Sequence, residues 1–256
     1  MTTATPVLEA KGIWKTFEGV SALRDVSLEV GEGERVGLIG PNGAGKTTLF
    51  NCMLGVIPVD RGDVVLCGHD LAGLPVHERA KLGIGRTFQR IELFSGSTVR
   101  EHLLIAERVR EGTGRLWKDL IGRGRPSGAE IAATDEVLAL LGLDDVADEP
   151  VEHLTLGQGR LVEVARALMT RPRLLLLDEP SSGLDRQETA DLARTLRSVQ
   201  EEQGFSILLV EHDVELVSSF TERCYALDFG AVIGSGPTAE VLADPLVRKA
   251  YLGVAT

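Results

Sequence analysis

The chain has 256 residues, 43% of them hydrophobic, so it is long enough to bury a full core as one large domain. Its formal net charge of −11 disfavours general nucleic-acid binding, because an acidic surface repels a phosphate backbone. No apolar run approaches the roughly 18 residues that a membrane span needs, and the N-terminus lacks the basic and apolar regions of a signal peptide.

Two kinds of strand are expected along the chain. Short alternating patterns near the N-terminus predict an antiparallel subdomain with strands at residues 7–9, 26–30 and 63–66. Three stronger apolar runs are each followed by a helical pattern. These runs predict strands at residues 35–39, 174–177 and 206–210. The alternation of strand and helix indicates a parallel α/β sheet.

The middle of the chain, residues 90–152, loses the strand pattern, and we expect helices at residues 101–110 and 129–141. Ser127, followed three residues later by Glu130, predicts a capping box at the start of the second helix. The stretch between the helices, GTGRLWKDLIGRGRPSG, is typical of a loop. We therefore expect one α/β core with a helical insertion.

Residues 40–47, GPNGAGKT, match the phosphate-loop pattern G-x-x-x-x-G-K-[ST] directly after a predicted strand and before a helix. The glycines allow backbone amides to turn toward phosphate oxygens, and the positive end of the next helix faces the same anion. Lys46 is expected to reach the β- and γ-phosphates, and the Thr47 hydroxyl to bind Mg²⁺. The alternative is a chance glycine turn. The predicted nucleotide contacts are Gly40, Pro41, Asn42, Gly43, Ala44, Gly45, Lys46, Thr47 and Thr48.

A pair of carboxylates ends the apolar run in RLLLLDEP. A continuous apolar run predicts a central strand covered on both faces, and the carboxyl ends of such strands are where open parallel sheets bind ligands. Asp178 is expected to hold Mg²⁺, and Glu179 to orient or deprotonate the attacking water. The alternative is a solvated acidic turn.

The stretch LTLGQ, residues 154–158, precedes a helical pattern. Thr155 and Gln158 predict a capping box, and the free amides behind it form an anion site. Because the chain already holds phosphate at Lys46, a second such site suggests another chain's nucleotide; simple helix capping is the alternative. The helix is expected to bury one face, formed by Leu161, Ala165, Leu168 and Met169.

Together these motifs resemble the ATP-binding subunits of ATP-binding-cassette (ABC) transporters over nearly the whole chain. The resemblance implies that Phe17 stacks on adenine, with a strand-core phenylalanine as the alternative. It implies that Gln89 binds Mg²⁺ and couples it and the attacking water to the transmembrane partner. His212 in VEHD would contact the γ-phosphate. Asp185 in SSGLD would cross a dimer interface, although with Glu188 it also fits an ordinary helix cap.

LTLGQ occupies the place of the family signature, whose usual form is Leu-Ser-Gly-Gly-Gln. Thr155 keeps the hydroxyl, Gly157 and Gln158 are kept, and Leu156 departs from the pattern. The resemblance implies that two cassettes pack head to tail, each closing the other's ATP and Mg²⁺. It also implies transmembrane permease subunits, a second cassette that is this chain or a paralogue, and indirectly a substrate-binding protein. The expected location is the cytoplasmic face of the cell membrane.

The resemblance implies an α/β fold of the P-loop NTPase (RecA-like) type, with an N-terminal antiparallel β-subdomain and a helical subdomain insertion. A single ABC ATPase domain would span residues 1–256. Within it, residues 1–89 would hold the nucleotide-binding core with the β-subdomain, residues 90–153 the helical subdomain, and residues 154–256 the rest of the core.

Several stretches, among them GIGRTFQRIELFSGSTVREHLLIA and the closing VRKAYLG, resemble more closely the subunits of branched-chain (hydrophobic) amino acid importers. The insertion at residues 107–125 holds six Lys or Arg and three Asp or Glu, which fits either a solvated loop or a docking surface near the membrane. The alternatives are a lipid or lipopolysaccharide exporter, or a non-transport cassette ATPase. One phosphate loop and no sustained heptads argue against the latter.

Overall fold

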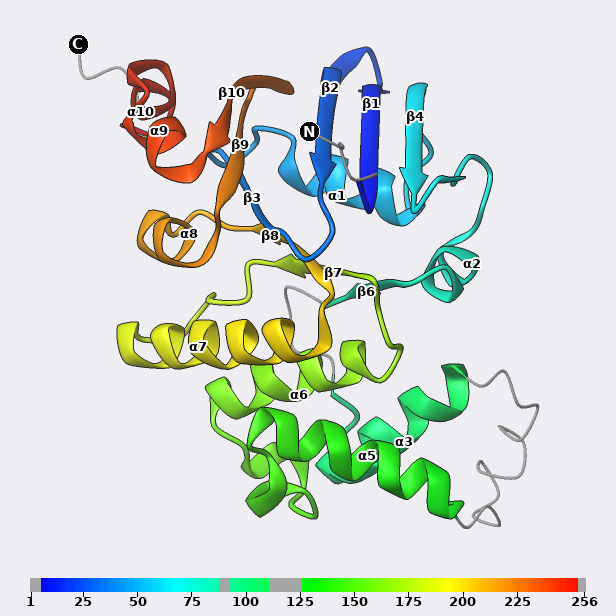
Figure 1. Ribbon diagram of the computed structural model, residues 1–256. Coiled ribbons are helices and arrows are strands. Elements are labelled where there is room, and N and C mark those ends of the chain that lie inside the picture. The colour runs from blue at the N-terminus through cyan, green and yellow to red at the C-terminus, as the bar shows by residue number, and fades with distance from the viewer. Residues whose placement is uncertain (1–5, 88–92, 111–125, 253–256) are drawn as a thin grey trace.

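The structure is a computed structural model that describes residues 6–87, 93–110 and 126–252 (Figure 1). Three predictions concern residues outside these ranges: the role of Gln89, the subdomain boundary at residues 89 and 90, and the insertion at residues 111–125. They stay predictions. No helix in the described ranges combines the length and apolar character that crossing a membrane requires.

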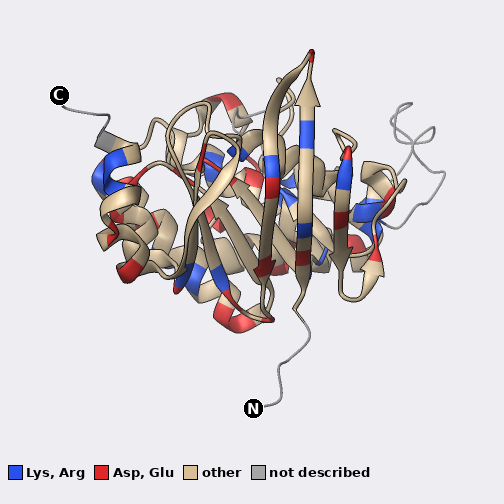
Figure 2. Ribbon diagram, turned by 90° about the horizontal axis from the view of Figure 1, so that it is seen from above, with Lys and Arg blue, Asp and Glu red and all other residues tan. Residues whose placement is uncertain are grey.

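An antiparallel sheet of four strands, in the order β2-β1-β4-β5, forms the N-terminal layer (Figure 1). The predicted strands are confirmed, but they are longer than expected because β1 and β2 pair along their whole lengths. Figure 2 shows acidic and basic residues interspersed along these strands. The strands are β1 (Leu8–Phe17), β2 (Val20–Val30), β4 (Arg61–Leu66) and β5 (His69–Asp70).

The central sheet has six strands in the order β10-β9-β3-β8-β7-β6, parallel except for β10. The three predicted core strands are confirmed. The strand predicted at residues 174–177 is β7, which extends by one residue to Asp178. The strands are β3 (Arg35–Ile39), β6 (Ile84–Arg86), β7 (Leu174–Asp178), β8 (Ser206–Val210), β9 (Arg223–Asp228) and β10 (Ala231–Pro237).

The continuous leucine run of β7 is explained by hydrophobic packing on both faces of this sheet. Leu174 and Leu176 belong to a core cluster shared with the antiparallel sheet and α1 (Lys46–Leu54). Leu175 and Leu177 belong to a second cluster, shared with the helices of the opposite face. All four leucines are fully buried, so the central strands are fixed from both sides.

Three helices, α6 (Leu156–Leu168), α7 (Arg186–Gln203) and α8 (Val214–Phe220), cover the face of the central sheet away from the antiparallel layer (Figure 1). Helices α3 (Val99–Arg110) and α5 (Gly128–Leu141) pack beyond α6. The remaining elements are α2 (Val76–Lys81), α9 (Thr238–Ala243), α10 (Pro245–Leu252) and the 3₁₀ turns Asp144–Val146 and Val151–His153.

The second helix of the insertion, α5, begins with the predicted capping box. The Ser127 hydroxyl accepts a hydrogen bond from the Glu130 amide, and the Glu130 carboxylate accepts one from the Ser127 amide, so the capping box is confirmed. The predicted buried face of α6 is confirmed for Ala165, Leu168 and Met169, whereas Leu161 is only half-buried. Val162 and Val164 are buried as well, because α6 is enclosed by the sheet, α7 and the α3–α5 pair.

Candidate nucleotide-binding and hydrolysis site

The sheet order brings the predicted motifs together. Strand β8 lies between β3 and β7 and is parallel to both, so their carboxyl ends meet at one edge. Residues 40–47 follow β3, Asp178 and Glu179 end β7, and His212 follows β8. A cavity of about 430 Å³ opens at this edge. It is lined by Ala22, Asn42, Gly43, Ala44, Gly45, Lys46, Thr47, Thr48, Glu179 and His212.

The shape of the phosphate loop depends on glycine at two positions. Gly40 has φ +152°, and a Cβ there would lie 2.2 Å from the Leu227 carbonyl oxygen. Gly45 has φ +104°, and a Cβ there would lie 2.7 Å from the Ala22 carbonyl oxygen. Helix α1 follows directly, with no side-chain cap and no acidic residue in its first turn. Its first amides and its positive end are therefore left to bind an anion.

Lys46 is 6% exposed, and its Nζ donates to the carbonyl oxygens of Gly40 at 2.6 Å and Pro41 at 3.1 Å. Burial lowers the pKa of this ammonium, although the charges of Glu179 and Asp178 act in the opposite direction. A charged hydrogen bond from this ammonium to a phosphate oxygen would offset the free-energy cost of burying the charge.

The two carboxylates at the end of β7 lie in different environments. Burial raises the pKa of Asp178 to about 6, the charge of Glu179 adds to this, and Lys46 opposes it. Glu179 has φ +46°, in the left-handed region that a residue with a side chain rarely adopts, and its amide donates to the Val210 carbonyl oxygen at 2.9 Å. Such backbone strain is found where the surrounding structure holds a functional group in place.

His212 faces this pair from the end of β8. Its Nδ1 lies 3.7 Å from Glu179 Oε1 and 3.7 Å from Glu211 Oε2, while 56% of its side chain is exposed. The ring is thus beside the candidate base and open to the cavity, where it can meet a terminal phosphate. The other histidines fit the prediction of surface or core residues. His102 is buried, and His69, His77 and His153 are exposed.

Glu211, which has a fully buried carboxylate, was not predicted from the sequence. Its Oε1 accepts hydrogen bonds from the Ser181 amide at 3.0 Å and the Ser181 hydroxyl at 2.6 Å. Its Oε2 accepts one from the His212 amide at 3.0 Å. Glu211 therefore ties the segment after the β7 carboxylates to the histidine. The signal was present in SILLVEHD, where a charged residue directly follows a fully apolar strand.

The donor chemistry of the site fits Mg²⁺ bound together with phosphate. Asp178 offers a carboxylate and Thr47 a hydroxyl, both hard oxygen donors. Among the described residues, no group of three or more His, Cys, Asp or Glu could hold a metal by itself. Mg²⁺ commonly binds through one or two protein oxygens plus substrate phosphates, so this sparse set is the expected kind. Gln89, the third predicted ligand, lies outside the described residues.

Phe17 ends β1 in the hairpin whose second strand carries Ala22 into the cavity wall. Its side chain is 43% exposed, and the Lys15 Nζ lies 5.4 Å from the ring centroid. The alternative of a strand-core phenylalanine is therefore wrong. The exposed ring is available to a planar ligand, and adenine stacking stays a prediction.

The LTLGQ stretch starts α6 with the predicted capping box. The Thr155 hydroxyl accepts from the Gln158 amide at 3.2 Å, and Gln158 Oε1 accepts from the Thr155 amide at 2.9 Å. Thr155 is exposed and Leu156 is 41% exposed. Of the described residues that line the cavity, none comes from this stretch. The signature position is thus presented to solvent, away from the nucleotide edge of its own chain.

Leu156, the departure from the family pattern, lies over Gly183 in the neighbouring SSGLD segment. A Cβ on Gly183 would come within 2.9 Å of Leu156 Cδ2, and Gly183 has φ +85°. Asp185, in the same segment, caps α7. Its Oδ1 accepts from the Glu188 amide at 2.8 Å, and Glu188 Oε2 accepts from the Asp185 amide at 3.0 Å. The helix-cap interpretation is confirmed, and a contact of Asp185 across an interface stays a prediction.

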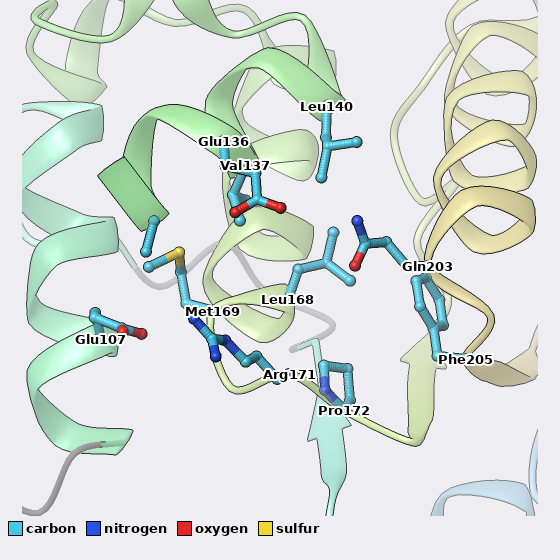
Figure 3. A pocket seen from close by; sticks show the side chains of 11 residues that line it. Glu107, Glu136, Val137, Leu140, Leu168, Met169, Arg171, Pro172, Gln203 and Phe205 are labelled. Atoms are coloured by element: carbon cyan, nitrogen blue, oxygen red, sulfur yellow. The ribbon is translucent and has the colours of Figure 1, made fainter. Parts of the chain in front are cut away.

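A further hollow, of about 370 Å³, lies between α5, the end of α6 and the turns before β7 and β8 (Figure 3). It contains Pro172, which precedes β7, and Phe205, which precedes β8, so it lies at the amino ends of the strands. Ligands of open parallel sheets bind at the carboxyl ends. This rule favours the edge at Lys46 and Asp178, rather than this hollow, as the candidate nucleotide site.

Residues 23–182 match the family described as "ABC transporter". The chain belongs to this family. Residues 231–256 also match the description "Branched-chain amino acid ATP-binding cassette transporter". The ABC transporter subunit is 39% identical, over 98% of the chain and 99% of the relative, to the high-affinity branched-chain amino acid transport ATP-binding protein BraF of Pseudomonas aeruginosa. It is 35% identical, over 96% and 97%, to the lipopolysaccharide export system ATP-binding protein LptB of Escherichia coli.

Solved structures agree with this assignment. MJ1267, an ATP-binding cassette of an ABC transporter, has a TM-score of 0.88 and 31% identity, covering 98% of this chain and all of that one. MJ0796, a cassette described as a dimer in a post-hydrolysis state with ADP and Pi, has a TM-score of 0.74 and 28% identity, covering 90% and 98%. The predicted fold class, family and ATPase activity are confirmed. The chain is the ATP-hydrolysing subunit of a membrane ABC transporter.

Proposed function

We propose that this ATPase subunit powers the import of branched-chain or other hydrophobic amino acids from the cytoplasmic face of a membrane. The observation that supports the cargo is the 39% identity to BraF over nearly the whole chain, together with the match of residues 231–256. The alternative is lipopolysaccharide export, because the chain is also 35% identical to LptB. A substrate-binding protein would deliver the amino acid to the permease.

We assign separate tasks to the residues of the site. The amides of residues 40–47 and the Lys46 ammonium hold the phosphates of ATP. Asp178 and Thr47, with Gln89, would hold Mg²⁺, which neutralises charge on the phosphates when it is bound. Glu179 takes the proton of the attacking water, and its strained backbone fixes the carboxylate at the cavity wall.

His212 is assigned to the terminal phosphate because its ring is half exposed to the cavity and lies beside Glu179. Phe17 is assigned to the adenine ring. We infer that one chain covers ATP along one side only, between Lys46 and Phe17. The opposite side would need atoms from elsewhere.

The second cassette supplies these atoms in our proposal. The exposed start of α6, with the Thr155 hydroxyl, the Gly157 amide and Gln158, would close on the partner's ATP. Asp185 lies in the SSGLD segment that packs against this helix start through Gly183. ATP favours the closed pair because these contacts exist only when both cassettes meet, and loss of the γ-phosphate releases them.

The permease would dock in an apolar groove of about 360 Å³ between β6, α2 and α3. Three large apolar side chains of the groove are exposed, Phe94 at 57%, Ile105 at 38% and Val109 at 61%. His102 stacks on Phe94 with centroids 5.4 Å apart, and the Phe94 amide lies 3.2 Å from its Nε2, so the exposed ring is held in position. Contiguous exposed apolar surface of this kind marks a protein-binding site.

Uptake of radiolabelled leucine tests the cargo. The gene is deleted, and the deletion strain is complemented with the wild-type chain or with Glu179→Gln. Restoration of leucine uptake by the wild-type chain alone is the expected result. Unchanged uptake in the deletion strain, accompanied by a defect in outer-membrane lipopolysaccharide, would assign the subunit to the exporter instead.

A further inference from the structure

The C-terminal helix α10 is fixed on the central sheet at the side of the phosphate loop. The Asp244 carboxylate accepts a hydrogen bond from the Leu246 amide at 2.7 Å and caps its first turn. Val247 is 2% exposed and packs at Gly234 of β10, where a Cβ would lie 3.1 Å from Val247 Cγ2. Helix α10 therefore has a defined position, and the residues of its last turn meet the loop that follows β3.

Tyr251, in this last turn, contacts the phosphate loop directly. Its hydroxyl oxygen accepts a hydrogen bond from the Gly40 amide at 2.7 Å. Burial raises the pKa of the phenol to about 12, although the Gly40 amide acts in the opposite direction. The hydroxyl is thus a neutral group at physiological pH, and it is placed on a backbone donor that begins the phosphate loop.

Gly40 is held on both sides by this arrangement. Its amide donates to Tyr251, and its carbonyl oxygen accepts from the Lys46 Nζ at 2.6 Å. The Leu227 carbonyl oxygen lies so close that only glycine fits between. A rotation of the Gly40 backbone would move the peptide that contacts the phosphate-binding lysine. The residue that limits this rotation comes from 211 positions further along the chain.

We propose that Tyr251 is a positioning residue for ATP binding, which sets the orientation of Gly40 and through it the phosphate loop. The proposal rests on the assignment of residues 40–47 to the phosphates. It gives the C-terminal segment, residues 231–256, a task at the nucleotide site in addition to packing. Removal of the hydroxyl weakens ATP binding, and it leaves the chemistry of Glu179 and His212 in place.

The chain provides a matched control in its other tyrosine, Tyr225. That hydroxyl accepts hydrogen bonds from the Glu29 amide at 3.1 Å and from the Arg223 guanidinium at 3.2 Å, and the side chain is 6% exposed. Tyr251 and Tyr225 thus make the same kind of bond, a phenol accepting from a backbone amide. Only the Tyr251 bond involves the phosphate loop, so Tyr225→Phe reports the general cost of losing such a bond.

The test compares Tyr251→Phe, Tyr225→Phe and the wild-type chain in the full-length protein. ATP affinity is measured by titration calorimetry with Mg²⁺, the KM and kcat for ATP by phosphate release, and exchange of the Gly40 amide by NMR. For Tyr251→Phe we expect about 3- to 10-fold weaker ATP binding with a matching rise in KM, since one net hydrogen bond is lost. We expect its kcat to stay within about twofold and the Gly40 amide to exchange faster. Tyr225→Phe should keep wild-type affinity and wild-type exchange at Gly40.

Two results would overturn the proposal. One is an unchanged ATP affinity and KM in Tyr251→Phe, and the other is an equal loss in both variants, which would indicate general destabilisation. Failure of the phosphate-site assignment looks different, because the wild-type chain itself would not bind ATP. Exchange of the Gly40 amide needs no nucleotide, so it tests the Tyr251 contact in that case as well.

Discussion

The nucleotide edge of the central sheet and the start of α6 were both predicted to bind phosphate, yet they are built in opposite ways. At the edge, Lys46 is buried, Glu179 has a positive φ, and burial raises the pKa of Asp178 to about 6. At the start of α6, Thr155 and Leu156 are exposed in an ordinary capping box. The first region has the local strain and buried charge that are typical of functional sites, and the described residues at the start of α6 have neither.

This difference indicates which of the two regions can be recognised as a site from one chain and which needs a second chain. Strained and buried charged groups cost stability, and a fold keeps them where they act. A capped helix start does not lower folding stability, so its structure alone does not distinguish capping from ligand binding. In our proposal, the distinction comes from a second chain that brings the two regions together. Four predictions test this comparison, from the largest expected effect to the smallest.

Glu179→Gln should lower ATP turnover by about 10²- to 10⁴-fold, the contribution usual for a general base. ATP binding should remain, and a closed dimer should accumulate because the γ-phosphate stays in place. Phosphate release and size-exclusion chromatography with ATP measure the two effects. Glu240→Gln, an exposed carboxylate on α9, is the matched control and should behave as the wild type. Wild-type turnover in Glu179→Gln would remove the catalytic assignment from the nucleotide edge.

Lys46→Ala should weaken ATP binding by about 100-fold, because a charged hydrogen-bond donor to the phosphates is lost. Titration calorimetry with ATP and Mg²⁺ measures this change. Lys81→Ala, which removes an exposed lysine of α2, serves as the control. An affinity within threefold of the wild type, about 0.7 kcal/mol, would show that the buried lysine serves only the fold.

Asp178→Asn should separate stability from function. The folded-state pKa of about 6 is above the ordinary value of 3.8, so the folded chain binds more protons, and this group lowers stability as pH rises from 3.8 through 6. Without nucleotide, the variant should be more stable than the wild type by about 1–2 kcal/mol at pH 7.5, with a smaller gain at pH 4.5.

Urea unfolding at both pH values measures this gain, and phosphate release should show that the Mg²⁺-dependent ATPase activity is lost. A variant that is less stable than the wild type at pH 7.5 would mean that Asp178 is a structural residue.

Thr155→Ala should cost about 1 kcal/mol of stability through loss of the α6 cap, and should also lower the ATPase activity. Ser127→Ala removes the same kind of cap from α5 and provides the control. Equal melting-temperature shifts, with lost ATPase activity in Thr155→Ala alone, would show a role beyond capping. Equal activities in the two variants would leave the start of α6 with capping as its whole function.

Most of the central layout was predictable from local sequence. The leucine run of β7 and the GPNGAGKT segment after β3 are each visible within a few residues, and parallel strands place their carboxyl ends together. The three capping boxes, at Ser127, Thr155 and Asp185, were also local patterns, and all are confirmed.

The features that were not predicted from the sequence depend on contacts between segments that are distant along the chain. Glu211 gains its role only when β8 lies beside β7, which brings Ser181 within 2.6 Å of its carboxylate. Tyr251 meets Gly40 only because α10 packs back on β10. Leu161 was assigned to a buried face by helical periodicity, but enclosure of α6 on several sides changed the burial. Periodicity describes one element, whereas these features are set by its neighbours.

The most direct test of the composite site is a crystal structure of Glu179→Gln with ATP and Mg²⁺. We expect a dimer in which Thr155, Gly157 and Gln158 of one subunit lie within hydrogen-bond distance, about 3 Å, of the triphosphate held at Lys46 of the other. A dimer in which the start of α6 faces solvent, far from either triphosphate, would contradict this expectation.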